Sequence, residues 1–196
     1  MKKLIIALFA LVPALVLASG GGAHLDHAGN DLADKESLKR GFDSYVNYCL
    51  GCHQLQYQRY NRTFVDLGIS EEEGSEKYLF NGQKSGQHIT NAMPAKQAKA
   101  WFGNTPPDLT LMARLKSPDW IYSYLRSFYV DSSRPFGVNN TISADVAMPH
   151  VLQGLQGVRT RVITQEKVTA NEEKGIEAQD EVSHLTPATG GTMTTE

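Results

Sequence analysis

The sequence predicts an all-α domain with long loop insertions, preceded by a signal peptide. Three observations support this prediction. Apolar residues recur at helical spacing over residues 34–49 and again over 120–129. The stretch 81–107 between them is rich in Gly, Asn, Gln and Pro, a composition typical of long loops. The chain also begins with a short basic start followed by an apolar run.

The start of the chain has the pattern of a secretory signal peptide. Lys2 and Lys3 precede an apolar run from Leu4 to Leu17, and small residues follow it. The run is shorter than the roughly 20 residues that a membrane-spanning helix needs. We therefore expect residues 1–19 to be the signal peptide and 20–196 to form one domain. An uncleaved N-terminal anchor is the alternative.

The composition is that of a globular protein that does not bind nucleic acid. Hydrophobic residues make up 41% and charged residues 20%, which is ordinary for a soluble fold. The formal net charge is −2 and the sequence has no long basic run, so nucleic acid is not an expected partner.

Several elements can be located from periodicity and capping residues. Leu38, Phe42 and Tyr45 lie on one side of the first expected helix, and Asp34 or Ser37 could cap its start. Asp119 is the expected cap of the later helix Trp120–Tyr129. Residues 131–147 are expected to form turns. Weaker patterns suggest helices at Ser70–Phe80, Ala95–Trp101 and Leu109–Leu115, and a hairpin arm at Thr160–Val168.

The only two cysteines of the chain lie in Cys49-Leu50-Gly51-Cys52-His53, which is the C-x-x-C-H signature of covalent haem attachment. The spacing suits the chemistry, because one helical turn presents two thiols to two vinyl groups on the same porphyrin edge. His53 then projects beneath the ring, where an imidazole nitrogen can ligate iron. The sequence therefore predicts one covalent haem c.

Three other kinds of site use part of this pattern. A thioredoxin-like pair also has C-x-x-C, but it favours a βαβ setting that we do not find in this sequence. A plain disulfide does not account for His53 beside the second cysteine. A zinc site needs more Cys or His ligands at regular spacing, and the other histidines are scattered, at His24, His27, His88, His150 and His184.

An electron-transfer haem needs a second axial ligand, and methionine is a common choice because it raises the reduction potential. Met148 and Met93 both precede a proline, which favours an extended backbone that can push a thioether onto a haem face. His150 would instead give a bis-histidine haem. Periodicity does not choose among them, and the residues alone favour Met148 only slightly.

Beyond the haem motif, the chain resembles the cytochrome c1 family, the haem subunit of the ubiquinol–cytochrome c reductase (bc1) complex. The resemblance covers roughly residues 33–157. The Pro-Pro-Asp-Leu block followed by a Met-Pro loop is its most specific part. The matching blocks are Arg40-Gly41-Phe42, Cys49–His53, Trp101-Phe102-Gly103-Asn104-Thr105-Pro106-Pro107-Asp108-Leu109, Trp120–Leu125, Asn139-Asn140 and Val146–Leu152.

The resemblance implies a cytochrome c-like haem domain and a role for each matched residue. Cys49 and Cys52 would hold the haem, His53 would be the proximal iron ligand and Met148 the distal one. Pro107 and Leu109 would pack near the haem. Arg114 would pair with a haem propionate, because a guanidinium suits a carboxylate; a solvated surface arginine is the alternative. No catalytic acid, base or nucleophile is implied.

The family implies electron relay on the periplasmic side of the inner membrane. The haem subunit receives an electron from the Rieske iron–sulfur protein, assembles with cytochrome b and passes the electron to a cytochrome c. The alternatives are a free periplasmic electron carrier and a five-coordinate haem enzyme or sensor. Family members end with a further helix and a C-terminal membrane anchor, neither of which we find before Glu196, so we expect an incomplete chain.

Overall fold

The computed structural model describes residues 24–80, 82–171 and 176–193, so the expected signal peptide at 1–19 lies outside it. Within these residues no helix has the length and apolar character needed to cross a bilayer. The elements in chain order are α2 (Lys35–Ser44), the π-helical turn η2 (Tyr45–Cys49), β1 (Leu55–Arg59), α3 (Tyr60–Leu67), α4 (Glu71–Tyr78), β2 (His88–Ile89), α5 (Ala95–Phe102), α6 (Met112–Lys116), α7 (Pro118–Arg126), β3 (Phe128–Val130), β4 (Val138–Asn140), α8 (Gln153–Gln156), β5 (Arg161–Asn171) and β6 (Ile176–Leu185).

The first expected helix is confirmed, and it leads directly into the C-x-x-C-H motif. Asp34 caps α2, because its carboxylate accepts a hydrogen bond from the backbone N–H of Ser37 at 2.9 Å. The helix continues as the π-helical turn η2, whose last residue is Cys49. Single π-turns of this kind are frequent at functional sites. The prediction of one regular helix over residues 34–49 therefore missed a change of winding just before the first cysteine.

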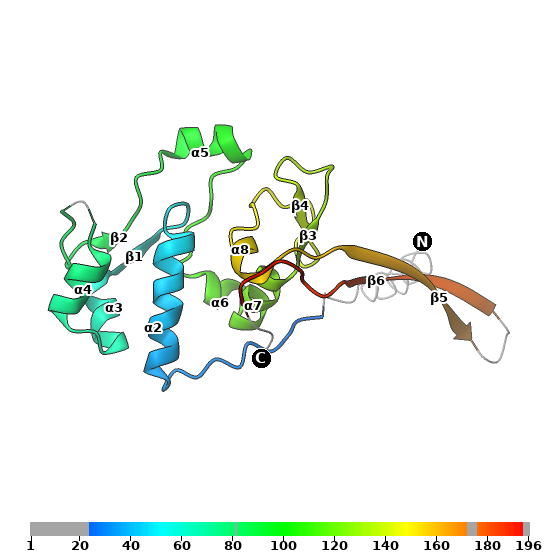
Figure 1. Ribbon diagram of the computed structural model, residues 1–196, viewed down its shortest axis with the longest axis horizontal. Helices are drawn as coiled ribbons and strands as arrows, with labels where there is room; N and C mark the ends of the chain where they lie inside the picture. The colour runs from blue at the N-terminus through cyan, green and yellow to red at the C-terminus, as the bar shows by residue number, and fades with distance from the viewer. Residues whose placement is uncertain (1–23, 81, 172–175, 194–196) are drawn as a thin grey trace, which may run out of the picture.

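An aromatic cluster packs α2 against α3 and α4, on the left in Figure 1. The ring of Phe42 lies 4.8 Å from that of Tyr78, which in turn lies 6.0 Å from Phe64. Gly74 lets α4 approach this closely, because a Cβ at this position would lie 2.5 Å from the Phe64 ring. The cluster fixes the end of α2 that carries the cysteines. The buried residues of the cluster are Phe42, Leu50, Tyr60, Phe64, Leu67, Ile69, Tyr78 and Ile89.

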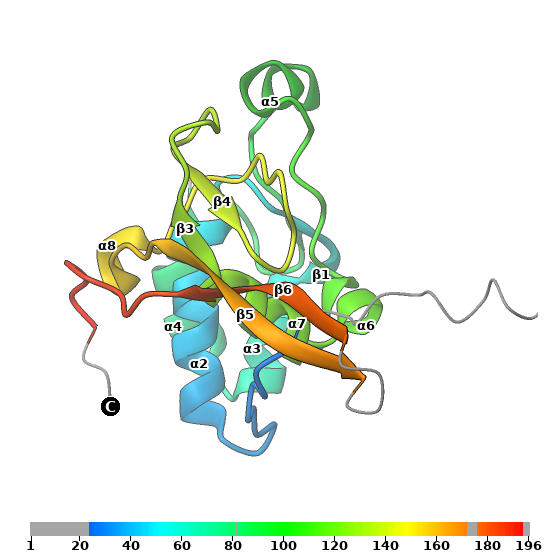
Figure 2. The same ribbon diagram turned by 90° about the vertical axis from the view of Figure 1, so that its right-hand side faces the viewer.

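The expectation of an all-α fold is confirmed only in part, because the secondary structure of the described residues is mostly helical but also includes three two-stranded antiparallel sheets. β1 pairs with β2 and β3 with β4, and both pairs join segments of only two to five residues, too short to leave a periodic signal. The hairpin expected at Thr160–Val168 is confirmed as β5 and β6, which pair over most of their length. Figure 1 shows this hairpin as an arm that extends away from the helices, and in Figure 2 the arm points toward the viewer.

The helix expected at Trp120–Tyr129 is confirmed as α7, with different ends. Ser117, not Asp119, caps it by accepting a hydrogen bond from the N–H of Trp120. The carboxylate of Asp119 instead accepts the N–H of Ala28 at 2.8 Å, which ties the N-terminal segment to this helix. The helix ends at Arg126 because residues 128–130 form β3. Of the weaker patterns, those near residues 70–80, 95–101 and 109–115 are confirmed as α4, α5 and the shorter α6.

Candidate haem site

The backbone winds the C-x-x-C-H motif into one turn. The N–H of Leu50 donates to the carbonyl of Tyr45 at 2.9 Å, which completes the π-helical turn. The N–H groups of Cys52 and His53 then both donate to the carbonyl of Cys49, at 3.0 and 2.8 Å. This turn brings two free thiols and an imidazole to the same wall of a cavity.

The His53 ring is held in one tautomer. Its Nδ1 lies 2.8 Å from the carbonyl oxygen of Pro107, and because a carbonyl only accepts, Nδ1 must carry the proton. The Nε2 lone pair is then left for a metal, an arrangement common among metal-ligating histidines. The Tyr45 hydroxyl donates to the His53 carbonyl at 2.8 Å, and burial raises the pKa of Tyr45, so this donor stays protonated. Ring and backbone of His53 are thus both fixed.

The Pro-Pro-Asp-Leu block is tied to the segment that follows the haem motif. The Leu109 N–H donates to the Gln54 carbonyl at 2.8 Å, and the two carboxylate oxygens of Asp108 accept the N–H groups of Gln56 and Thr110 at 2.8 and 3.0 Å. Burial alone would raise the pKa of Asp108, but these hydrogen bonds outweigh it and hold the pKa below its ordinary value. The ionised carboxylate therefore secures the block whose Pro107 carbonyl orients His53.

The loop that carries Met148 is fixed by polar side chains. The Arg134 guanidinium donates to the carboxylate of Asp145 at 3.1 Å and to the carbonyls of Asp145 and Val146 at 2.6 and 3.4 Å. The side-chain oxygen of Asn139, a residue only 7% exposed, accepts the N–H of Val146 at 3.4 Å. These contacts fix the backbone just before Met148 and therefore the position from which its side chain extends.

The Met148 sulfur itself contacts a tyrosine to which the sequence analysis assigned no role in the site. The Tyr124 hydroxyl, from α7, lies 3.6 Å from Met148 Sδ. Burial raises the pKa of Tyr124 to about 12. The sequence signals for Tyr124 were helical spacing, which core residues share, and its place in the block Trp120–Leu125. Neither indicates a contact with the sulfur, so this contact could not be predicted.

One cavity joins the motif, the Pro-Pro block and the Met148 loop, although these segments are far apart in the sequence. The space between these segments, counted out to the solvent at its open mouth, is about 720 Å³. Apolar side chains make up most of its wall, which suits a largely apolar macrocycle. The lining residues are Tyr48, Cys49, Cys52, His53, Phe102, Asn104, Thr105, Pro106, Pro107, Ala147, Met148, Pro149 and Val151.

These residues fit a haem better than a redox-active cysteine pair. Burial, together with the nearby Cys52, raises the pKa of the Cys49 thiol, whereas reactive dithiols depend on a lowered pKa. An imidazole with a free Nε2 and a thioether in one apolar cavity are donors that haem iron accepts as axial ligands. The donor set therefore suits a covalently held haem.

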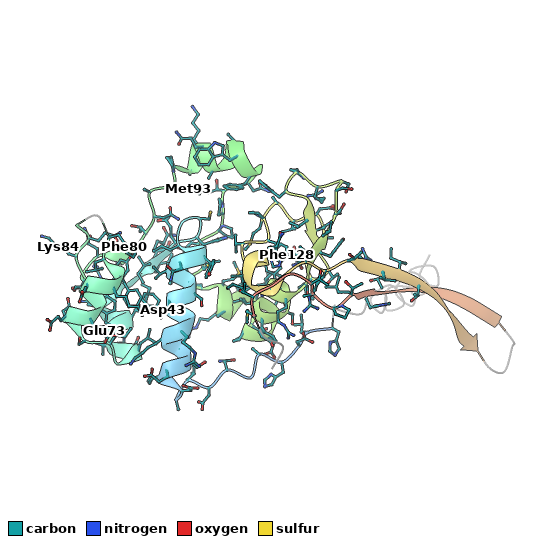
Figure 3. All side chains as sticks on the ribbon, in the orientation of Figure 1. Asp43, Glu73, Phe80, Lys84, Met93 and Phe128 are labelled. Atoms are coloured by element: carbon teal, nitrogen blue, oxygen red, sulfur yellow. The ribbon has the colours of Figure 1, made fainter. Side chains whose placement is uncertain are left out.

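The remaining expected site residues lie outside the cavity wall. The backbone N–H of Leu109 donates to Gln54, but the Leu109 side chain does not line the cavity. Arg114 is exposed on α6. Met93 lies on the segment before α5 (Figure 3), and its N–H donates to the side chain of Asn91. The His150 ring stacks on Phe128 at 4.9 Å, and burial lowers its pKa. Of the three ligand candidates, Met148 alone lines the cavity with His53.

Comparison with known proteins identifies the family. The model of the cytochrome C1 family matches residues 28–179. Cytochrome c1 of Allochromatium vinosum is 54% identical over 164 residues, which are 83% of this chain and 67% of that protein. A protein of Nitrosomonas europaea named ammonia monooxygenase gamma subunit is 46% identical over 157 residues, 80% of this chain and 67% of that protein.

The family match spans both halves of the cavity, from the C-x-x-C-H turn to the Met148 loop. The alignments cover about two thirds of each relative's length. With most of its length matched by the family model and more than half of the aligned residues identical in one relative, this chain belongs to the cytochrome c1 family of electron-transfer haem proteins.

Proposed function

We propose that the protein is the haem c subunit of a bc1-type complex, which accepts an electron from a Rieske iron–sulfur protein and passes it to a cytochrome c. The observation that carries the proposal is the shared cavity of Cys49, Cys52, His53 and Met148. The family match and the 54% identity to a cytochrome c1 support it.

Each residue of the cavity has a distinct part in this proposal. Cys49 and Cys52 would hold the haem through two thioether bonds, while His53 Nε2 and Met148 Sδ would be its axial ligands. The haem supplies a one-electron couple when bound. The protein keeps the imidazole oriented through the Pro107 carbonyl and surrounds the site with apolar side chains, which favour the less charged reduced state.

The proposed partners follow from the family. Cytochrome b and the Rieske protein would be neighbours in the complex, a cytochrome c would be the acceptor, and the location would be the periplasmic side of the inner membrane. A free periplasmic carrier would have the same haem without these neighbours. A haem enzyme or sensor would leave the sixth iron position open, so Met148 would not be a ligand.

The Nitrosomonas relative supports a second candidate function. Its name describes a subunit of an ammonia monooxygenase, and it matches 80% of this chain at 46% identity. A cytochrome c1-type protein that serves a monooxygenase would have the same haem site and different neighbours. Affinity purification of the full-length protein from its native membranes distinguishes the two, because co-purification of cytochrome b and Rieske subunits supports the bc1 assignment. Recovery of monooxygenase subunits in their place would overturn it.

The haem site is tested with the protein made in a host that matures c-type cytochromes. We expect a haem stain that survives a denaturing gel, because only covalent haem remains bound. We also expect the charge-transfer band of methionine–iron ligation in the oxidised protein and no rapid binding of carbon monoxide to the reduced protein.

Matched variants assign the residues. Cys49→Ala together with Cys52→Ala is expected to abolish the stain, and Met148→Ala to abolish the charge-transfer band. Met93→Ala is the control, because Met93 also precedes a proline but lies outside the cavity wall. A band that survives Met148→Ala and disappears in Met93→Ala would refute the ligand assignment. A colourless wild-type protein would refute the proposed function itself.

A further inference from the structure

The position of the Tyr124 ring is fixed by an aromatic column along α7. Trp120 stacks on it at 5.0 Å and an interplanar angle of 9°, and Phe128 meets it edge-on at 5.3 Å. The three residues are four apart in sequence, so they lie on one side of the helix and its extension. Neighbours on two sides leave the ring little freedom, so the direction of its hydroxyl is set by packing.

The same tyrosine contacts both the Met148 loop and β4, and Phe128 adds a third contact. Its hydroxyl reaches Met148 Sδ at 3.6 Å, and its backbone carbonyl accepts the side-chain N–H of Asn140, which is 1% exposed, at 2.7 Å. Phe128, at the end of the column, stacks on His150 two residues after Met148. The aromatic column and the Met148 segment are therefore held together at the sulfur itself, at Asn140 before it and at His150 after it.

A thioether sulfur has two lone pairs, and ligation of iron uses one of them. The second remains able to accept a hydrogen bond, weakly, from a hydroxyl. Within the described part of the chain, Met148 Sδ is the one hydrogen-bond partner of the Tyr124 hydroxyl. Methionine is a flexible side chain with several rotatable bonds, so a donor held by a rigid helix restricts where its sulfur lies.

We propose that Tyr124 is a positioning residue whose hydroxyl donates to the Met148 sulfur and raises the reduction potential of the haem. This inference rests on the proposed function, because it assumes that Met148 ligates the iron. The hydrogen bond draws electron density from the sulfur and places the positive end of the O–H dipole near the metal. Both effects disfavour the oxidised state, which carries one more positive charge, and hydrogen bonding around the ligands is an established means of tuning haem potentials.

Tyr124→Phe in the haem-loaded protein tests the proposal, because it removes the hydroxyl and keeps the ring that Trp120 and Phe128 contact. We expect the reduced-to-oxidised ratio at a fixed ambient potential to fall about threefold, which is a shift of ~28 mV at 59 mV per tenfold for a one-electron couple. We also expect the methionine–iron charge-transfer band to move or weaken. Tyr122→Phe is the matched control, because its hydroxyl, on the same helix, contacts Arg126 instead.

The outcomes separate this inference from the proposed function. A lower potential in Tyr124→Phe, with Tyr122→Phe unchanged, supports the inference, whereas an unchanged potential and band in Tyr124→Phe overturn it and leave Met148 ligation intact. Absence of the band from the wild-type protein overturns the proposed ligand set instead. If Tyr124→Phe does not fold, 3-fluorotyrosine in place of Tyr124 provides the test, because a more acidic phenol is a stronger donor and should raise the potential. No rise would then refute the inference.

Discussion

The Asp108 carboxylate provides the clearest quantitative test of how the site is held. Asp108→Ala removes the acceptor of two backbone N–H groups, those of Gln56 at 2.8 Å and Thr110 at 3.0 Å. Hydrogen bonds to charged groups contribute about 1.5–3 kcal/mol, but Asp108 is only partly buried, so ~1 kcal/mol for each bond is the better figure. We therefore expect a loss of about 2 kcal/mol in the free energy of unfolding.

Urea denaturation followed by circular dichroism measures this loss. A loss of ~2 kcal/mol corresponds to a roughly 30-fold larger unfolding constant, since 1.4 kcal/mol is about tenfold. For a chain of this size it should lower the melting temperature by about 4–8 °C. Asp31→Ala is the control, because it removes one local, exposed acceptor, that of the Ala33 N–H. A loss within ~0.5 kcal/mol of that control would refute the assignment of Asp108 as the residue that secures the block.

The pH dependence of the same variant provides an independent check. The pKa of Asp108 is lower in the folded protein than its ordinary value of 3.8, so its ionised form stabilises the fold. That stabilisation is fully present above the unfolded pKa and is lost as the pH falls through the lower folded pKa. The unfolding free energies of the wild type and Asp108→Ala should therefore converge below about pH 4. A constant difference between pH 3 and pH 7 would contradict the role of the charge.

Three further changes have definite expected outcomes. Gly74→Ala would place a Cβ 2.5 Å from the Phe64 ring. The cost of overpacking, about 1–3 kcal/mol, should outweigh the gain in helix propensity, about 1 kcal/mol, so urea denaturation should show a less stable protein. Asp43→Asn removes the carboxylate that accepts hydrogen bonds from Lys77 and Tyr78. Because the pKa of Asp43 is lowered and that of Lys77 is raised, the effect of the substitution on the melting temperature should diminish as the pH falls below 3.8 and as it rises above 10.5. An effect independent of pH would rule out the ion pair as its cause. Arg134→Lys keeps the positive charge but loses the guanidinium hydrogen bonds to Asp145 and Val146, which should loosen the Met148 loop. Carbon monoxide should then displace the methionine more easily and bind the reduced protein faster, as measured by stopped-flow. An unchanged rate would mean that Arg134 does not hold the loop.

Much of the helical framework could be predicted from local pattern. The expected helix at residues 34–49 begins at its capping Asp34, and the later helix retains its apolar face. The sheets β1–β2 and β3–β4 were missed because β2, β3 and β4 are only two or three residues long, and β2 pairs with a strand distant in sequence. The cap of α7 was misassigned because Ser117 and Asp119 are both good capping types, and the choice depended on the contact of Asp119 with Ala28.

The same distinction applies to the site, where features local in the sequence could be predicted and those set by tertiary contacts could not. The C-x-x-C-H motif is local, so the residues proposed to hold the haem could be located from spacing alone. The acceptor for His53 Nδ1 could not, because Pro107 is distant in sequence and contributes only its carbonyl. The partner of Met148 was hidden for a different reason, since a tyrosine on an apolar helix face is usually explained by packing. In both cases the missing information was tertiary.

The cavity wall is formed by segments separated along the chain, and this separation sets an order of events during synthesis. Met148 is made 95 residues after His53 (148 − 53 = 95). At about 5–20 residues per second, both cysteines exist for roughly 5–20 s before the methionine does. During that interval the chain has both thiols but not the Met148 side of the cavity wall. The Met148 side of the cavity wall is the last part to be synthesised, so the cavity cannot be complete before that segment exists.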